Sequence, residues 1–229
     1  MSNAETADIT PSPSLTSFSE VLGDFTTEWR VLFISAIALP LGVLSAFLAL
    51  ALLRLISGFT NLFFFQRLSI DDAAPVDAHV GLAIVLIPMI GGLIVGLMAR
   101  YGSERIRGHG IPEAIEAILI NGARVQPRVA FLKPLSAAIS IGSGGPFGAE
   151  GPIILTGGSF GSLAAQFCHL SSVERKTLLV AGAAAGMSAT FASPVAACLL
   201  AVELLLFEWK PRSLLPVAVA SLTAYTVRY

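Results

Sequence analysis

The sequence contains little charge. Only 13% of its 229 residues are Asp, Glu, Lys or Arg, whereas soluble domains usually have about 25%. Hydrophobic residues make up 55% of the chain, and the mean hydropathy is +0.79. A soluble core of this size cannot hide so much apolar surface, so we expect lipid to cover much of it. The net charge of −1 gives no electrostatic reason to expect a nucleic-acid partner.

Cysteine and targeting features are also scarce. Cys168 and Cys198 lie in apolar stretches; a disulfide is conceivable, but two small buried thiols are the simpler expectation. The beginning of the chain lacks the basic start and apolar run of a secretory signal. We therefore expect a polar cytoplasmic segment over residues 1–29 and a membrane domain over residues 30–229.

Two apolar runs, 31–56 and 80–99, are long enough to cross about 30 Å of hydrocarbon. The segment between them, 57–79, is acidic. Arg30 precedes the first run, and several arginines follow the second over 100–107. By the positive-inside rule both basic ends are cytoplasmic and the acidic loop is outside.

The remaining apolar segments are short and interrupted by glycine and proline. They cover residues 111–120, 129–141, 153–167, 178–191, 195–207 and 214–227. Broken helices are tolerated in lipid where their free backbone groups are buried in protein or line a cavity. This layout is typical of a channel or transporter with half-helices ending near the midplane. The alternative is a set of ordinary spans with poorly defined ends.

Two glycine–proline segments, 108–113 (GHGIPE) and 142–152 (GSGGPFGAEGP), each precede an apolar run. Each places a helix N-terminus at a buried position, where free amides and the helix dipole attract an anion. Glycine lets the backbone approach the ion closely, and proline in the first turn costs no hydrogen bond. Two such ends aimed at one point would bind a small anion without the full positive charge that would slow its release.

Glu150 lies within the second of these segments. A carboxylate there would compete with the anion for the same amides and would leave when protonated or displaced. Such a group would gate a pore and could carry protons. The alternative is a glutamate that caps an exposed helix end.

Several segments together resemble the CLC family of voltage-gated chloride channels and chloride–proton antiporters. Residues 108–113 resemble its GSGIPE motif, residues 148–152 (GAEGP) its GREGP or GKEGP motif, and residues 182–194 (GAAAGMSATFASP) its GAAAGLAAAFNAP stretch; residues 157–161 and 199–203 resemble the continuations of these motifs. The resemblance runs from about residue 32 to 229. It implies an all-α integral membrane protein that forms one inverted-repeat half of the CLC-type fold, with full spans followed by short broken helices.

The resemblance also implies a function. It is selective transport of chloride or similar small anions across a bilayer, without enzymatic chemistry, metal or cofactor, chloride itself being the substrate. Glu150 takes the position of the gating glutamate. The implied anion-binding residues are His109, Gly110, Ile111, Ala149, Glu150 and Gly151. Family members are homodimers, and residues 199–206 and 214–229 are candidates for the dimer contact. A bacterial inner membrane fits the polar N-terminal segment.

Three positions depart from the family pattern. His109 replaces a serine; its ring either donates to the anion, with pH-sensitive binding, or turns toward the cytoplasmic vestibule. Ala149 replaces a basic residue. Leu204 stands where proton-coupled members have an inner glutamate, and Glu203 points about 100° away around the helix. Glu203 is therefore a doubtful proton-path residue, which favours a passive channel over the alternative, a chloride/proton exchanger.

The family's second half supplies a GxFxP motif and a pore tyrosine, and neither occurs in this sequence. We expect the chain to be a fragment of a longer protein. The alternative is that two short chains meet to complete the anion site.

Other patterns carry less weight. Residues 157–161 fit the G-x-S-x-G pattern of an intramembrane serine hydrolase, but Ser159 has only the distant His169 and no obvious acid. His109 and Glu113 have a spacing that could serve a metal, without a further ligand. Residues 174–176 (Glu-Arg-Lys) are expected to form a solvated loop.

Overall fold

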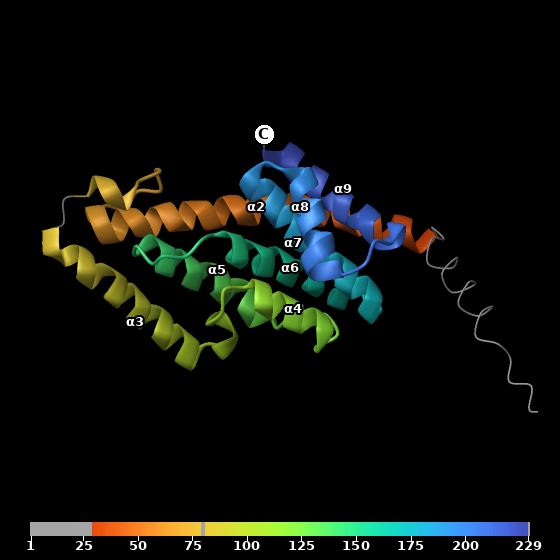
Figure 1. The fold of residues 1–229 in the computed structure, drawn as a ribbon, viewed down its shortest axis with the longest axis horizontal. Helices are drawn as coiled ribbons and strands as arrows, with labels where there is room; N and C mark the ends of the chain where they lie inside the picture. Colours follow the sequence, from red (N-terminus) through yellow and green to blue (C-terminus); the bar gives the residue numbers. More distant parts are fainter. Residues whose placement is uncertain (1–28, 79–80, 229) are drawn as a thin grey trace, which may run out of the picture.

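The computed structural model describes residues 29–78 and 81–228, and within those ranges the chain forms helices and loops without a strand (Figure 1). The helices are α2 (Trp29–Phe65), α3 (Leu86–Tyr101), α4 (Ile111–Leu119), α5 (Pro127–Gly142), α6 (Glu150–Phe167), α7 (Ser172–Phe191), α8 (Pro194–Ala201) and α9 (Pro211–Arg228). Short 3-10 turns are η1 (Pro75–Asp77), η2 (Gly81–Val85) and η3 (Glu104–Ile106), and η4 (Val202–Leu206) is a π-helical turn. The predicted N-terminal segment lies outside the described residues, apart from Trp29.

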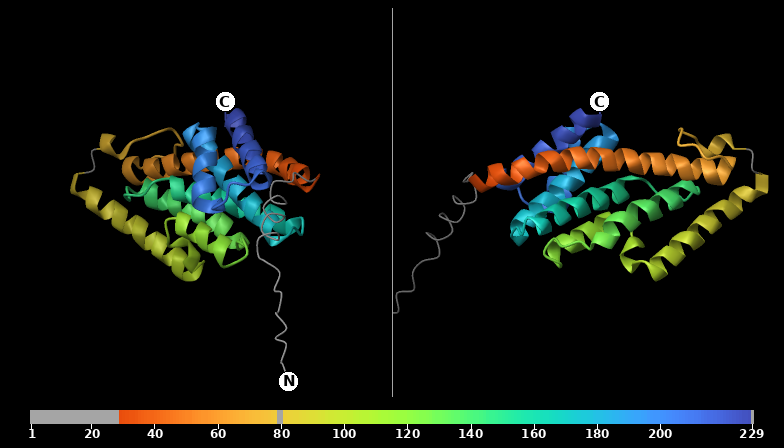
Figure 2. Two further views of the ribbon diagram at one scale, coloured as in Figure 1. Left: turned by 45° about the vertical axis from the view of Figure 1, so that its right-hand side comes forward. Right: turned by 180° about the vertical axis from the view of Figure 1, so that it is seen from behind.

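The first helix is longer than the sequence predicts. α2 has 37 residues, or about 55 Å at 1.5 Å per residue, and it runs along the molecule beside α5 and α6 (Figures 1 and 2). The predicted end at residue 56 is wrong because the polar groups that follow are satisfied without ending the helix. Asn61 Nδ2 donates to the carbonyls of Ser57 (3.0 Å) and Asp71 (2.7 Å), so the loop folds back on the helix.

By length and composition, α2 is the one helix in the described ranges that could cross a membrane by itself. The second predicted span is a 16-residue α-helix, α3, preceded by the 3-10 turn η2. α3 slants away from the other helices at one end of the molecule (Figures 1 and 2).

The prediction of short, broken helices is confirmed for α4 and α8, whereas α6, α7 and α9 have 18 to 20 residues. α4 has nine residues and α8 has eight, and α8 passes directly into η4. α4 and α8 carry a proline within their first two positions, where its missing N–H costs no helical hydrogen bond. Glycine and proline therefore mark the breaks that the sequence indicated.

The core is built on a close crossing of α6 and α7. A Cβ atom at Gly157 would collide with the carbonyl of Gly182, and a Cβ at Gly182 would collide with that of Gly157. α2 packs on both of these helices, and α9 packs on α7 and α2. Small residues therefore bring these backbones into contact, as is common where helices cross in membranes.

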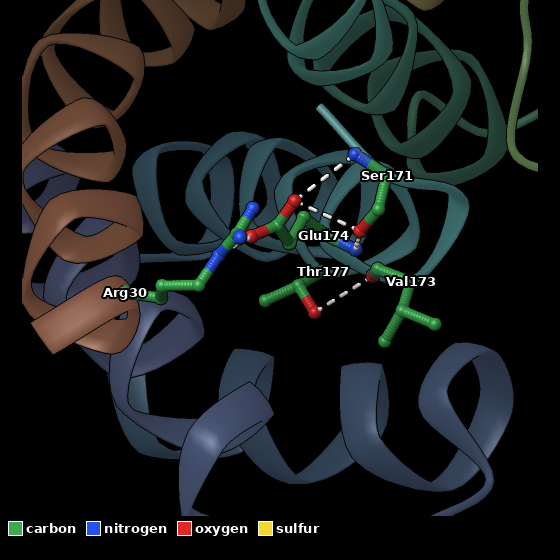
Figure 3. Close-up of polar contacts among 5 residues, drawn as sticks. All are labelled: Arg30, Ser171, Val173, Glu174 and Thr177. Atoms are coloured by element: carbon green, nitrogen blue, oxygen red, sulfur yellow. Dashed lines mark hydrogen bonds and ion pairs between the residues drawn. The ribbon is translucent and has the colours of Figure 1, made fainter. Parts of the chain in front are cut away.

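The start of α7 is a buried polar junction, not the predicted solvated loop (Figure 3). Ser171 is the N-cap, and its Oγ accepts from the Glu174 amide at 3.4 Å. The Glu174 carboxylate accepts from the Ser171 amide at 3.0 Å and from Arg30 Nε of α2 at 2.8 Å. Glu174 and Arg175 are each 8% exposed. This capping box is why the helix begins before the charged residues.

The prediction of two buried thiols is wrong for Cys168. Cys168 is exposed because it follows the last residue of α6, Phe167, at the end of the helix. The apolar sequence around it does not reveal that the helix ends there. Cys198 is half-buried in α8, and both cysteines are free thiols.

Candidate anion-binding site

The two glycine–proline segments meet in the structure. A Cβ atom added to Gly110 would overlap the Gly151 carbonyl group, and one added to Gly151 would overlap the carbonyl and the imidazole of His109. Gly110 also has a φ of 113°, which residues with a side chain rarely adopt. Glycine at both positions is therefore what allows the two loops to touch, backbone to backbone.

This contact places two helix N-termini side by side. Ile111 is the first residue of α4 and Glu150 the first of α6. Both line one cavity of about 250 Å³, which also contains Ser193 and Leu204. The first amides of a helix have no partner within it. In the described part of the chain no hydrogen bond is made by the amides of Ile111, Glu150 and Gly151.

The predicted site residues do not all play equivalent parts in this arrangement. The Gly110 amide donates to Glu113 Oε2 at 2.7 Å and is therefore already bonded. Ala149 is the N-cap of α6 and supplies no side-chain cap. His109 is exposed and lines a smaller cavity of about 80 Å³ together with Lys133 and Gly148.

The two acidic candidates differ in position. Glu150 is exposed and lines the larger cavity, beside the N-terminus of α4. Glu203 is also exposed but does not line that cavity, whereas its neighbour Leu204 does. Both residues lie in the π-helical turn η4. The side chain that faces the anion cavity at this point is thus apolar.

Sequence reasoning missed Lys133. It lies in α5, is 2% exposed, and its Nζ donates to the Gly108 carbonyl and to the Ile106 carbonyl at 3.1 Å. A signal was present, because an ionisable residue inside an apolar segment is expensive and usually has a specific partner. Sequence analysis noted Glu113 within the 108–113 segment and as a possible metal ligand, but not as a carboxylate that accepts a hydrogen bond from the Gly110 amide.

The geometry does not support the two alternative sites, a serine hydrolase and a metal site. Ser159 is fully buried, and its Oγ donates to the Leu155 carbonyl in the preceding turn of α6. His169 is exposed beyond the end of α6, and no hydrogen bond joins it to Ser159 in the described part of the chain. Among the described residues no group of three His, Cys, Asp or Glu side chains could hold a metal.

Comparison with known proteins places this architecture in a family. The voltage gated chloride channel family matches residues 91–229, which is more than half of the chain. The chain belongs to this family. Its fold is the all-α CLC type: a solved structure of a slow cyanobacterial Cl⁻/H⁺ antiporter is similar with a TM-score of 0.64 at 22% identity, over 89% of this chain and 47% of that one.

Curated relatives carry both kinds of name. The chain is 30% identical to the voltage-gated ClC-type chloride channel ClcB of Yersinia pseudotuberculosis over 82% of its own length and 45% of the relative's. It is 31% identical to the H⁺/Cl⁻ exchange transporter ClcA of Salmonella schwarzengrund over 77% of its length and 36% of the relative's. A putative chloride channel protein, ClcB-like, of Ralstonia nicotianae is 32% identical over 61% of the chain and 34% of the relative. The chain therefore spans less than half the length of these relatives.

Proposed function

We propose that this chain supplies one half of a transmembrane pathway for chloride or similar small anions. The observation that carries the proposal is the backbone contact between Gly110 and Gly151, which brings the N-termini of α4 and α6 to one cavity. The amides of Ile111, Glu150 and Gly151 would hold the ion with partial positive charges only. Binding of this kind is strong enough to select an anion and weak enough to release it.

Glu150 is proposed as the gate. Glu150 is the first residue of α6 and lines the cavity together with Ile111, the first residue of α4. An ionised carboxylate can accept the same hydrogen bonds as chloride, so the two compete for one position. Protonation, or displacement by an incoming anion, would then open the pathway.

Uncoupled conduction is the version of this function that we favour. Leu204 lines the cavity with Glu150, and Glu203 does not, so the cavity lacks a second acid from η4 that could pass a proton to Glu150. Chloride/proton exchange is the alternative, supported by the similarity to a protein named as an H⁺/Cl⁻ exchange transporter.

The proposed partners are a lipid bilayer, the second half of the CLC fold and a second copy of the subunit. Their support is a large exposed apolar surface on the described helices: Leu93 and Leu97 of α3, Leu199 and Leu200 of α8, and Leu215 and Leu222 of α9 are all at least 40% exposed. Within the candidate dimer segments, Leu205 and Leu206 are buried in the chain itself. The bacterial relatives favour a bacterial cell membrane.

The test is chloride efflux from liposomes that contain the longest natural form of this protein, with internal pH recorded. Glu150→Gln and Glu150→Ala are compared with Asp77→Asn, which removes an exposed carboxylate in the loop before α3. We expect chloride to move without protons, and the Glu150 variants to change the rate and its pH dependence by about tenfold or more. Asp77→Asn should behave as the unchanged protein.

Three results would count against the proposal. Proton movement in a fixed ratio to chloride, abolished by Glu150→Gln, would establish the exchanger instead. Equal rates in all variants would remove Glu150 from the gate. Absence of anion movement in every form would contradict the proposed function as a whole.

A further inference from the structure

A buried lysine of α5 contacts the loop that leads into α4. Lys133 is 2% exposed within α5, and its ammonium donates to the carbonyls of Ile106 and Gly108. Burying an ammonium group costs several kcal/mol unless hydrogen bonds or an opposite charge compensate it. Its hydrogen-bond partners here are main-chain carbonyls of the loop that leads into α4. The ammonium group therefore determines where these carbonyls point.

Glu113 of α4 contacts the same loop. Its Oε2 accepts from the Gly110 amide at 2.7 Å, and its carboxylate lies so close to Gly108 that a Cβ atom there would overlap it. The residue between these two anchored glycines is His109. Opposite charges on α5 and α4 therefore fix the peptide groups on both sides of His109.

The planar trans peptide converts these contacts into directions. In a trans peptide the C=O and the following N–H point opposite ways. Because Lys133 binds the Gly108 carbonyl, the His109 amide must point away from Lys133. Because Glu113 binds the Gly110 amide, the His109 carbonyl must point away from Glu113, and it packs on Gly151 at the junction with α6.

We propose that Lys133 is a positioning residue of the anion site, which acts with Glu113 to fix the two peptide planes around His109. The inference rests on the proposed function, because positioning has meaning only where an anion binds. The carbonyl oxygens of Ile106 and Gly108 would repel an anion, and Lys133 keeps both turned toward α5. The loop that leads to the Ile111 amide at the start of α4 is thus fixed before the ion arrives, and no reorganisation of this loop is needed when it binds.

An alternative role for Lys133 is a general positive field that draws anions to the site. The two roles separate in Lys133→Gln and Lys133→Met. A glutamine retains a hydrogen-bond donor for a loop carbonyl but carries no charge, whereas methionine has a similar length and provides neither. Positioning predicts partial recovery with glutamine; a field effect predicts equal loss in both variants.

The matched control is Lys176→Met. Lys176 Nζ of α7 donates to the Leu206 carbonyl at 2.7 Å, so this variant also breaks a lysine-to-carbonyl bond, but at η4. We expect Lys176→Met to lower thermal stability without altering chloride affinity or selectivity.

The experiment measures chloride half-saturation and the chloride-to-nitrate flux ratio in liposomes, with thermal unfolding of each variant, using the longest natural form of the protein. Lys133→Met should raise the half-saturation concentration about tenfold and bring the flux ratio closer to one, and Lys133→Gln should fall between it and the unchanged protein. Glu113→Gln, which weakens the bond to the Gly110 amide, should change both quantities in the same direction and serves if Lys133→Met does not fold.

The outcomes separate this inference from the proposed function. Unchanged affinity and selectivity in Lys133→Met, or in Glu113→Gln when Lys133→Met does not fold, would overturn the positioning role while leaving anion transport in place. Equal losses in Lys133→Met and Lys133→Gln would assign Lys133 a field effect instead. If the unchanged protein moves no anion, the proposed function and this inference fail together.

Discussion

The N-termini of α7 and α6 differ in whether their free amides have hydrogen-bond partners. At α7, Ser171 and Glu174 form a reciprocal capping box, and Arg30 covers the carboxylate. At α6, the cap position is Ala149, which offers no side-chain acceptor, and the first residue faces a cavity. A closed helix start serves stability, whereas an open one leaves donors for a ligand.

α4 lies between these two cases. The Glu113 carboxylate accepts from the Gly110 amide, but in the described part of the chain the Ile111 amide makes no hydrogen bond, and Ile111 lines a cavity together with Glu150. In an apolar protein, a helix start without a side-chain cap therefore indicates where a ligand can bind. Substitutions at the starts of α6 and α7 test this difference.

The largest effect is expected from Gly151→Ala. The new Cβ would overlap the carbonyl and ring of His109 and push the two open helix starts apart. Chloride efflux should fall about a hundredfold, the scale at which a displacement of ~1 Å affects a preorganised site, while unfolding free energy falls by only about 1–3 kcal/mol. Gly96→Ala in α3, with open space around it, is the control. Normal efflux in a folded Gly151→Ala protein would refute the contact as the basis of the site.

A smaller loss is expected from Ala149→Asp, which closes the start of α6 in the manner of α7. An N-cap carboxylate can accept from the Gly151 amide and also repels an incoming anion. Efflux should fall about tenfold, with unfolding free energy unchanged or raised. Ala149→Asn, of similar shape but neutral, should have a weaker effect. An Asp variant with faster efflux would contradict the assignment of these amides.

The opposite change, Ser171→Ala, opens the start of α7. Loss of the N-cap should lower the unfolding free energy by about 1 kcal/mol, as measured by chemical or thermal unfolding. Efflux per folded protein should not change, because this end lies outside the anion cavity. A large loss of efflux with normal stability would mean that α7 contributes to transport.

The smallest effect is expected from Arg30→Gln. Arg30 bonds Glu174 at 2.8 Å, but its side chain is 69% exposed, so solvent and salt screen the ion pair. The loss should stay below about 1 kcal/mol and shrink as salt rises. A loss that is larger and independent of salt would show that the pair acts as a buried one.

Sequence alone predicted the features that depend on local chemistry. Glycine and proline indicated where α4, α6 and α8 begin, and the family resemblance identified the two loops. The polar residues beyond residue 56 led the sequence analysis to end the helix too early. Their partners, such as the Asp71 carbonyl that accepts from Asn61, come from a later segment that folds back, which the local sequence does not reveal. The spacing of Ser171 and Glu174 predicts a capping box. The hydrogen bond from Arg30 to Glu174, however, depends on packing between α2 and α7.

The support behind the site was the least predictable part. The Gly110–Gly151 contact joins residues far apart in the chain, and no local rule states that their backbones touch. Lys133 gains its meaning only from carbonyls that tertiary folding brings to it. An apolar run with a single lysine predicts a compensating partner, but it does not identify which loop supplies that partner.

Anomalous diffraction from crystals of the longest natural form, grown or soaked in bromide, would locate a bound anion directly. We expect a bromide peak within hydrogen-bonding reach of the Ile111 and Gly151 amides, and a stronger peak in Glu150→Gln crystals, in which no carboxylate competes. Ordered crystals with bromide bound elsewhere but none between the starts of α4 and α6 would contradict the proposed anion site.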